Sequence, residues 1–239
     1  MNLETLSDNP ELLDVINEMY SKPWPKFMSE DESVKKYWRK LYSVYPQYQL
    51  LLKEQSDYVG VANCFPIEWD GTEDNLPSGF DQAMEVIFNN QETANCLCAL
   101  AIVVGKKYSG KGISSKVLKV VKKIGNRQGF AKLIIPVRPT LKSQYPLVSM
   151  KDYMRWEKSG YPFDPWLKVH IKNGGKILRE ANPSLVVEGT VPQWENWTGM
   201  YFGTSGDYVV EGALNPISID RDNDFGKYVE PNVWILHEL

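Results

Sequence analysis

Apolar side chains in the first 46 residues recur at the three- and four-residue spacing of amphipathic helices. Asn9-Pro10 is a favourable helix start, a capping side chain followed by proline, and apolar positions continue from Leu12 to Tyr20. A second apolar stripe runs from Val34 to Tyr42, in a helix that we expect to begin at Ser29. The pattern therefore predicts two N-terminal helices that pack against a core.

After residue 46 the hydrophobic period changes to that of strands, and two runs are apolar throughout. The expected elements are hairpin strands at 47–53 and 58–64, a helix at Phe80–Asn90, a buried strand at Leu97–Val104, a basic amphipathic helix at Gly112–Gln128 and a buried strand at Ala131–Val137. The order of strand, glycine loop, helix and strand resembles a βαβ unit with two buried strands.

Beyond Pro139 the chain is rich in Pro, Gly and Trp, and its periodicity is weaker. Short helices are expected at Lys151–Lys158 and Asp164–Asn173, and strands at Ile177–Leu178, Leu185–Val187, Tyr208–Val210 and Tyr228–Leu236. No linker-like stretch divides the chain. We therefore predict one mixed α+β domain over 1–239, with helices at 1–46, the hairpin and strand–loop–helix–strand unit at 47–137, and a C-terminal half at 138–239.

The charge distribution changes this picture, because the formal net charge of −3 hides two opposed regions. Between Thr93 and Lys151 there is no Asp or Glu, but there are 12 of the 27 Lys and Arg residues. The rest of the chain carries the other 15 together with all 30 Asp and Glu residues, or −15. The basic segment predicts an anionic partner.

Several function classes are excluded by simple features of the sequence. The acidic N-terminus has no apolar stretch behind a basic start, and the longest apolar run, Cys96 to Val104, is too short for a membrane helix. Three cysteines outside any CxxC pair indicate buried free thiols in a reducing compartment. With two histidines, a His-rich zinc site is not expected. We predict a cytoplasmic protein with no metal, no nucleic-acid partner and no membrane association.

A glycine loop is the most informative motif. The segment from Ile102 to Ser115 leads from a strand to Gly105 and places Gly110 and Gly112 immediately before a helix. Free N–H groups and the helix dipole make such a junction an anion site. The lysines that reinforce it are Lys106, Lys107 and Lys111.

A P-loop is one interpretation of this segment, since Gly105, Gly110 and Lys111 match GxxxxGK. However, Gly112 occupies the position of the magnesium-binding Ser or Thr, and the next apolar strand ends in Pro and Arg rather than Asp. A nucleotide triphosphatase is therefore disfavoured.

The segment Lys107-Tyr-Ser-Gly110-Lys-Gly112 resembles the Gln/Arg-x-x-Gly-x-Gly/Ala loop of GNAT acyltransferases, with Lys in the first position. The resemblance implies a mixed, mostly antiparallel sheet flanked by helices, whose two central strands splay apart around coenzyme A. It also implies that strand amides polarise the thioester. The implied cofactor-binding residues are Ile102, Val103, Val104, Lys107, Tyr108, Ser109, Gly110, Lys111, Gly112, Ile113, Ser114 and Ser115.

The second half resembles stand-alone bacterial GNAT proteins and the GNAT-like loading domains of polyketide synthases. The matching segments include Pro136–Thr140, Tyr161–His170, Trp194–Gly199 and Glu230–Trp234. In the loading domains, a Thr and a His at these positions are associated with malonyl-CoA decarboxylation and acyl transfer to a thiol. The resemblance thus makes Thr140 and His170 catalytic candidates. The alternatives are a turn hydroxyl for Thr140 and a core histidine for His170.

Two further residues are substrate-binding candidates. Arg138 can pair with a substrate carboxylate or face solvent with its basic neighbours, and Tyr145 is one of several tyrosines suited to protonating the CoA thiolate. Tryptophans that can wall an acyl pocket, or equally lie in the core, are Trp24, Trp38, Trp69, Trp166 and Trp194.

These observations predict an acyl-CoA-dependent acyltransferase, with acetyl-CoA or another acyl-CoA as co-substrate. The acceptor is an amine or a thiol on a small molecule or a carrier protein, and the sequence leaves the oligomeric state open. Two alternatives stay open as well: a malonyl-CoA decarboxylase with S-acyltransferase activity, and a non-catalytic acyl-CoA-binding sensor.

Overall fold

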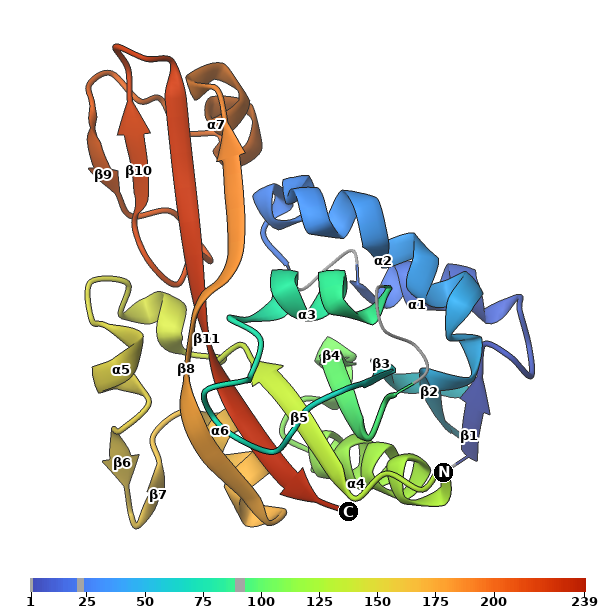
Figure 1. The fold of residues 1–239 in the computed structure, drawn as a ribbon. Coiled ribbons are helices and arrows are strands. Elements are labelled where there is room, and N and C mark those ends of the chain that lie inside the picture. The colour runs from blue at the N-terminus through green and yellow to red at the C-terminus, as the bar shows by residue number, and fades with distance from the viewer. Residues whose placement is uncertain (1, 21–23, 89–92) are drawn as a thin grey trace.

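A nine-stranded sheet runs through the computed structural model, which describes residues 2–20, 24–88 and 93–239 (Figure 1). The strand order is β1-β2-β3-β4-β5-β11-β10-β9, and β8 pairs with β11 beside this path. The strands are β1 Asn2–Thr5, β2 Gln49–Glu54, β3 Asp57–Ile67, β4 Cys96–Val104, β5 Lys132–Val137, β8 Gly175–Gly189, β9 Gly206–Tyr208, β10 Ile217–Asp220 and β11 Phe225–Glu238. A separate hairpin pairs β6 Glu157–Lys158 with β7 Tyr161–Pro162.

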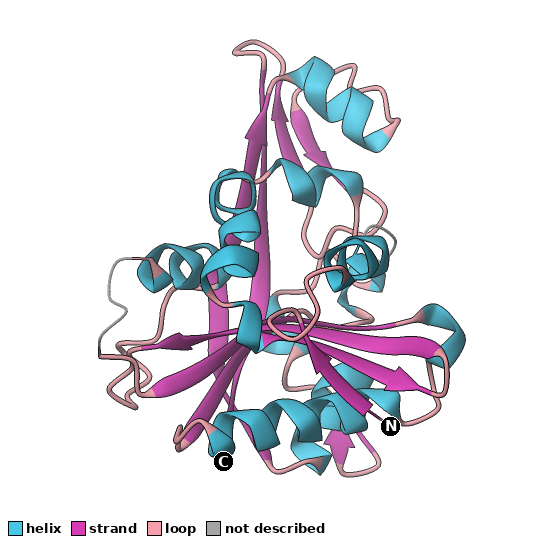
Figure 2. Cartoon of the chain, turned by 90° about the vertical axis from the view of Figure 1, so that its right-hand side faces the viewer, coloured by secondary structure: helices cyan, strands magenta, loops and turns pink. Residues whose placement is uncertain are grey.

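Helices lie on both sides of this sheet (Figure 2). Those in the described residues are α1 Leu12–Tyr20, α2 Glu32–Val44, α3 Phe80–Ile87, α4 Ile113–Arg127, α5 Met150–Tyr153, α6 Pro165–Lys172 and α7 Val191–Thr198. In the described part of the chain, no helix has the length and apolar content needed to cross a bilayer.

The two central strands separate after a short stretch of pairing. β4 and β5 run parallel and pair only at Leu97 with Leu133 and at Cys98 with Ile134. β3 continues to pair with the other edge of β4 up to the end of that strand, with a register shift that leaves Leu100 as a bulge. The edge of β4 beyond Cys98 therefore offers backbone N–H and C=O groups to a ligand. This confirms the predicted splayed strands.

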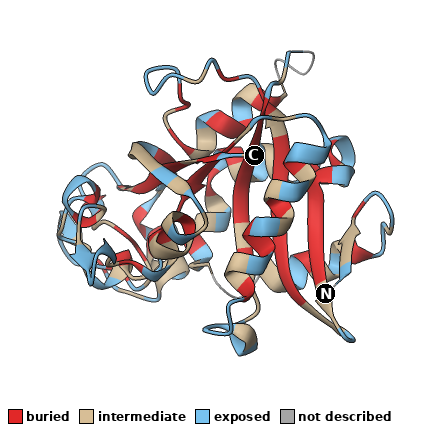
Figure 3. Ribbon diagram, turned by 90° about the horizontal axis from the view of Figure 1, so that it is seen from below, coloured by how far each residue is buried: buried red, intermediate tan, exposed pale blue. Residues whose placement is uncertain are grey.

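The two faces of the β2–β3 hairpin pack against different helices. Val61 lies in a buried cluster with Leu12 of α1 and Tyr42 of α2. Gly60 faces the other way, where a Cβ atom would lie 2.6 Å from Val117 of α4, so glycine permits the close approach of helix and strand. Seen from below, the strands under α4 are buried while the outer face of the helix is exposed (Figure 3).

An arm extends from this sheet. The upper parts of β8 and β11 continue beyond β5 and carry α7, β9 and β10 (Figure 1). The arm has its own buried cluster, in which the Phe27 ring lies 5.5 Å from Trp194 and 5.2 Å from Tyr228 between centroids. Because Phe27 belongs to the N-terminal segment, this contact joins the arm to the helices that flank the sheet.

The structure confirms most of the N-terminal and central elements. The hairpin, both apolar strands and the basic helix form as β2, β3, β4, β5 and α4. The second helix begins at Glu32 rather than at Ser29, because the Asp31 side chain caps it by accepting a hydrogen bond from Val34 N at 2.8 Å. α3 begins at Phe80 as predicted, whereas residues 89–90 of the expected helix lie outside the described residues.

The C-terminal half differs more from the prediction. The two short strands expected at 177–178 and 185–187 belong to one strand, β8, and the strand expected at 208–210 forms instead at 206–208. The helix expected at 151–158 is wrong beyond Tyr153, because α5 ends there and residues 157–158 join the β6–β7 hairpin. β1, β10 and α7 were not predicted: β1 and β10 have only four residues each, and the apolar pattern of α7 is weak. The three cysteines are buried free thiols, as expected.

Candidate active site

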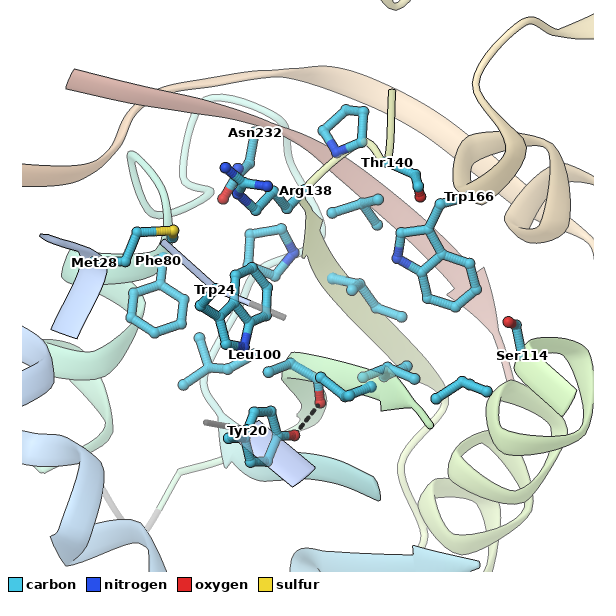
Figure 4. Close-up of a pocket in the computed structure, with 18 of the residues that line it drawn as sticks. Tyr20, Trp24, Met28, Phe80, Leu100, Ser114, Arg138, Thr140, Trp166 and Asn232 are labelled. Carbon is cyan, nitrogen blue, oxygen red and sulfur yellow. Dashed lines mark hydrogen bonds between the residues drawn. The ribbon is translucent and has the colours of Figure 1, made fainter. Parts of the chain in front are cut away.

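A cavity of about 1140 Å³ opens where β4 and β5 part (Figure 4). Its floor is the free edge of β4 from Leu100 to Val104, and β5 with the residues that follow it, 135–140, forms the facing side. The start of α4 lies at one end, and the N-terminal helices with α3 wall the other. The splayed strands thus create a space long enough to hold an extended ligand.

The α4 end is built from backbone. Gly110 and Gly112 both have φ of 74°, a left-handed conformation that favours glycine, and Gly112 caps the helix. A Cβ atom built on either residue meets nothing within 4 Å. The first N–H groups of a helix have no intrahelical partner, and no described side chain caps this one. The amides from Gly112 to Ser115 are therefore free to bind an anion.

Eight of the predicted cofactor-binding residues line this cavity: Ile102, Val103, Val104, Ser109, Gly110, Gly112, Ser114 and Ser115. Lys107, Tyr108, Lys111 and Ile113 are not among its lining residues. Lys107 Nζ lies 2.7 Å from Asp57 Oδ2, and the Tyr108 hydroxyl donates to the same oxygen. Hydrogen bonds from Lys107 and Tyr108 lower the pKa of Asp57, and the contact with Asp57 raises the pKa of Lys107.

Aromatic side chains wall the opposite end (Figure 4). Trp38 of α2 stacks on Phe80 of α3, with 6.0 Å between ring centroids, and Tyr20 of α1 meets Trp38 edge-on at 5.6 Å. The Tyr20 hydroxyl donates to Ala101 O of β4 at 3.3 Å, which ties α1 to the cavity floor. Trp24 completes the aromatic lining.

Two carboxyl groups stabilise the helices that carry the aromatic residues of this wall. Asp31 caps α2, and Asp81 of α3 accepts a hydrogen bond from Val186 N of β8 at 3.0 Å. Burial and the nearby charge of Asp31 raise the pKa of Asp81 to about 8, so that Asp81 is protonated at neutral pH. The hydrogen bond of Asp81 thus fixes α3, which carries Phe80, to the sheet, while Asp31 stabilises the start of α2, which carries Trp38.

An ion pair occupies the polar corner of the same end. Arg138 Nε lies 3.0 Å from both carboxylate oxygens of Glu230, and Arg138 Nη2 donates to Gly212 O at 2.5 Å. Tyr228 OH and Asn232 Nδ2 donate to the same carboxylate at 2.9 Å and 3.2 Å. The side chain of Arg138 is only 16% exposed, so the alternative of a solvent-facing arginine is wrong.

The structure separates the two residues predicted to be catalytic. Thr140 lines the cavity, whereas His170 does not. His170 is fully buried, and its Nδ1 lies 2.9 Å from His237 Nε2. The ring centroid of Trp166, which does line the cavity, lies 4.2 Å from that of His170. Burial lowers the pKa of both histidines, that of His237 to about 4. This arrangement matches the core-histidine alternative, and a catalytic role for His170 stays a prediction.

Tyr145 also lies outside the cavity lining. Its ring packs 5.0 Å from Trp156, in an aromatic cluster with Tyr153 and Phe163, and its role in substrate binding stays a prediction. Of the five candidate tryptophans, Trp24, Trp38 and Trp166 line the cavity, whereas Trp69 and Trp194 are buried in hydrophobic clusters.

Five of the lining residues were not predicted as site residues: Tyr20, Met28, Phe80, Glu230 and Asn232. One signal was available, because Glu230 is a carboxylate between apolar residues of a strand that is mostly buried, and such a group requires a buried partner. Its partner Arg138 is 92 residues away, and no local pattern connects the two.

Comparison with known proteins is consistent with this geometry. No family model matches the chain. The arginine N-acetyltransferase avaD of Aspergillus versicolor is 26% identical to it over 273 aligned residues, which span 100% of this chain and 94% of that protein.

Two solved structures share the fold over nearly the whole chain. The loading GNATL domain of CurA from Lyngbya majuscula superimposes with a TM-score of 0.65 at 17% identity, covering 99% of this chain and 96% of that domain. The GphF GNAT-like decarboxylase in complex with isobutyryl-CoA has a TM-score of 0.63 at 16% identity, with coverages of 100% and 99%. The chain thus has the fold of these GNAT-like domains and resembles an N-acetyltransferase in sequence over its full length.

Proposed function

We propose that this protein transfers an acyl group, in the simplest case acetyl, from coenzyme A to a nitrogen acceptor. The main support for this proposal is the cavity between β4 and β5, which extends from a free strand edge to the start of α4, where free N–H groups can bind an anion. The strand edge suits the amides and thioester of pantetheine, and the helix start suits the pyrophosphate. The similarity to an arginine N-acetyltransferase supports nitrogen as the acceptor atom.

Backbone groups perform most of the binding in this mechanism. The amides from Gly112 to Ser115 hold the pyrophosphate, and N–H groups on the β4 edge between Leu100 and Val104 hydrogen-bond the thioester carbonyl oxygen. These bonds stabilise the negative charge that develops on that oxygen. The acceptor nitrogen forms a bond to the carbonyl carbon, the carbon–sulfur bond then breaks, and the nitrogen loses a proton as the thiolate gains one.

We assign removal of the proton from the acceptor nitrogen to water. Glu230 is the only carboxylate among the described lining residues, and its oxygens are already bound by Arg138, Tyr228 and Asn232. Thr140 follows the end of β5 within the lining, where its hydroxyl is placed to donate a hydrogen bond to the acyl group. No step is assigned to His170 or Tyr145. Decarboxylation would require Thr140 and His170 to act together on one carboxylate, and only Thr140 lines the cavity.

Calorimetry with coenzyme A tests the binding site, and release of free thiol from acetyl-CoA tests the reaction. We expect binding and an acetylated product when a panel of primary amines is offered. Folded protein that does not bind coenzyme A at millimolar concentration would overturn the proposal. Binding without thiol release across a broad acceptor panel favours a sensor, and carbon dioxide release from malonyl-CoA favours the decarboxylase.

A further inference from the structure

The Arg138–Glu230 ion pair is the only buried charged feature of the cavity among the described residues. The other charged side chain in the described lining is Lys26, which is exposed to solvent. Water screens an exposed charge strongly, and a buried pair is screened far less. The electrostatics of the acceptor end therefore depend on Arg138 and Glu230.

This pair has no net charge, and it is rigidly held. Glu230 is 1% exposed and accepts hydrogen bonds from Arg138, Tyr228 and Asn232. Tyr228 OH accepts in turn from Leu214 N at 2.8 Å, which orients its proton toward the carboxylate. Burial raises the pKa of Tyr228 well above its usual value, so the hydroxyl stays a donor at all relevant pH. The guanidinium charge is thus matched inside the protein before any ligand enters.

Arg138 nevertheless keeps donors for a ligand. Nε is bound to Glu230 and Nη2 to Gly212 O, and neither of these bonds uses Nη1. The Trp24 ring lies 5.6 Å from the guanidinium carbon. Guanidinium hydrogen bonds lie in the plane of the group, so a ligand oxygen reaches Nη1 at the edge.

We infer that the acceptor end binds a neutral carbonyl oxygen, such as that of an amide, through Arg138, and rejects a carboxylate. This inference rests on the proposed function. A carboxylate would bring a second negative charge beside Glu230, in a cavity walled by Trp38 and Phe80 and without a second buried cation among the described residues. Like charges in such surroundings repel strongly. A neutral carbonyl accepts the same hydrogen bond without that repulsion, and the acceptor is therefore an amine that also carries an amide.

A matched pair of acceptors tests this inference directly. 4-(2-Aminoethyl)benzamide and 4-(2-aminoethyl)benzoate carry the same primary amine, separated by the ring from the group that differs. We expect kcat/KM with acetyl-CoA to be at least about tenfold higher for the amide. Equal use, or preference for the benzoate, would overturn the inference. Each compound is also titrated by calorimetry into protein loaded with coenzyme A, and failure of both to bind would overturn it as well.

Glu230→Gln sharpens the test, because it keeps the size of the side chain and removes its negative charge. The freed guanidinium charge then attracts the benzoate, and the amide-to-benzoate ratio of kcat/KM falls by at least about tenfold. The matched control is Glu188→Gln, which removes an exposed carboxylate of β8 that pairs with Lys227 of β11 at 2.8 Å, and we expect it to leave the ratio unchanged. A ratio that stays constant in folded Glu230→Gln contradicts the inference. Where that variant does not fold, the wild-type ratio decides alone.

The two proposals fail in different ways. If the protein binds coenzyme A and acetylates amines without any preference for the amide, this inference is wrong and the proposed function still holds. Folded protein that binds no coenzyme A sinks both.

Discussion

The two ends of the cavity are built from different parts of the polypeptide. The end proposed to bind coenzyme A presents backbone amides from one continuous segment, residues 102–115, and requires little of its side chains beyond Gly110 and Gly112. The proposed acceptor end presents side chains from separate segments, among them Trp38, Phe80 and Arg138. In the proposed function, recognition of the common donor is therefore local and tolerant of substitution, whereas recognition of the acceptor depends on tertiary packing.

The largest effect is expected from Gly112→Glu, which forces a side chain into a φ of 74° and sets a carboxylate against the pyrophosphate site. Affinity for coenzyme A should fall by about 100-fold or more, measured by calorimetry. Gly129→Glu is the control, because Gly129 follows α4 with a φ of 85° and an equally open Cβ direction. Similar losses in both variants would show that strain, rather than the anion site, causes the effect.

A second variant, His237→Gln, tests whether the buried histidines take part in the chemistry or only in the packing of the core. The pKa of His237 lies near 4 in the folded protein, below its ordinary 6.5, so the unfolded chain binds more protons between these values and the contribution of His237 to stability is lost as pH falls. His237→Gln removes this titration. The stability advantage of wild type over the variant should therefore shrink by about 2 kcal/mol between pH 7 and pH 5.

Denaturant unfolding at both pH values measures that difference. Thiol release by the folded His237→Gln variant at pH 7.5 should stay within about twofold of wild type, because the pair does not line the cavity. A large loss of turnover with an altered pH profile would instead assign the pair to the chemistry.

Trp38→Leu tests the aromatic wall. Removing the ring that stacks on Phe80 should lower kcat/KM for an aromatic amine by about tenfold and change coenzyme A affinity by less than about twofold. Trp197→Leu, in the arm against Trp194, should change neither quantity. If Trp38→Leu weakens both ligands equally, the two ends of the cavity are not independent.

The smallest effect is expected from Lys107→Ala. Lys107 belongs to the basic loop, but its ammonium group is exposed and paired with Asp57 rather than directed into the cavity. Coenzyme A affinity should fall by less than about threefold. A loss comparable to that of Gly112→Glu would mean that the lysine charge, rather than the backbone, carries pyrophosphate binding.

Much of the fold was predictable because its determinants are local. The apolar runs at 97–104 and 131–137 and the glycine loop between them predicted β4, α4 and β5, and the fold resemblance predicted their separation. β1 and β10 escaped prediction because four residues are too few to show a strand period, and β1 in addition depends on pairing with the distant strand β2. The predicted role of His170 rested on motif position, which carries no information about whether a side chain reaches a cavity.

The sequence by itself determined the proposed coenzyme A end of this protein, because a strand, two glycines and a helix start create free N–H groups wherever they occur in succession. It also separated a basic segment from an acidic remainder. Only the tertiary structure decided the acceptor end. It joined Arg138 to Glu230 across 92 residues and stacked Trp38 on Phe80, and it buried His170 against His237. Such contacts depend on how distant segments pack, and no local pattern in the chain records them.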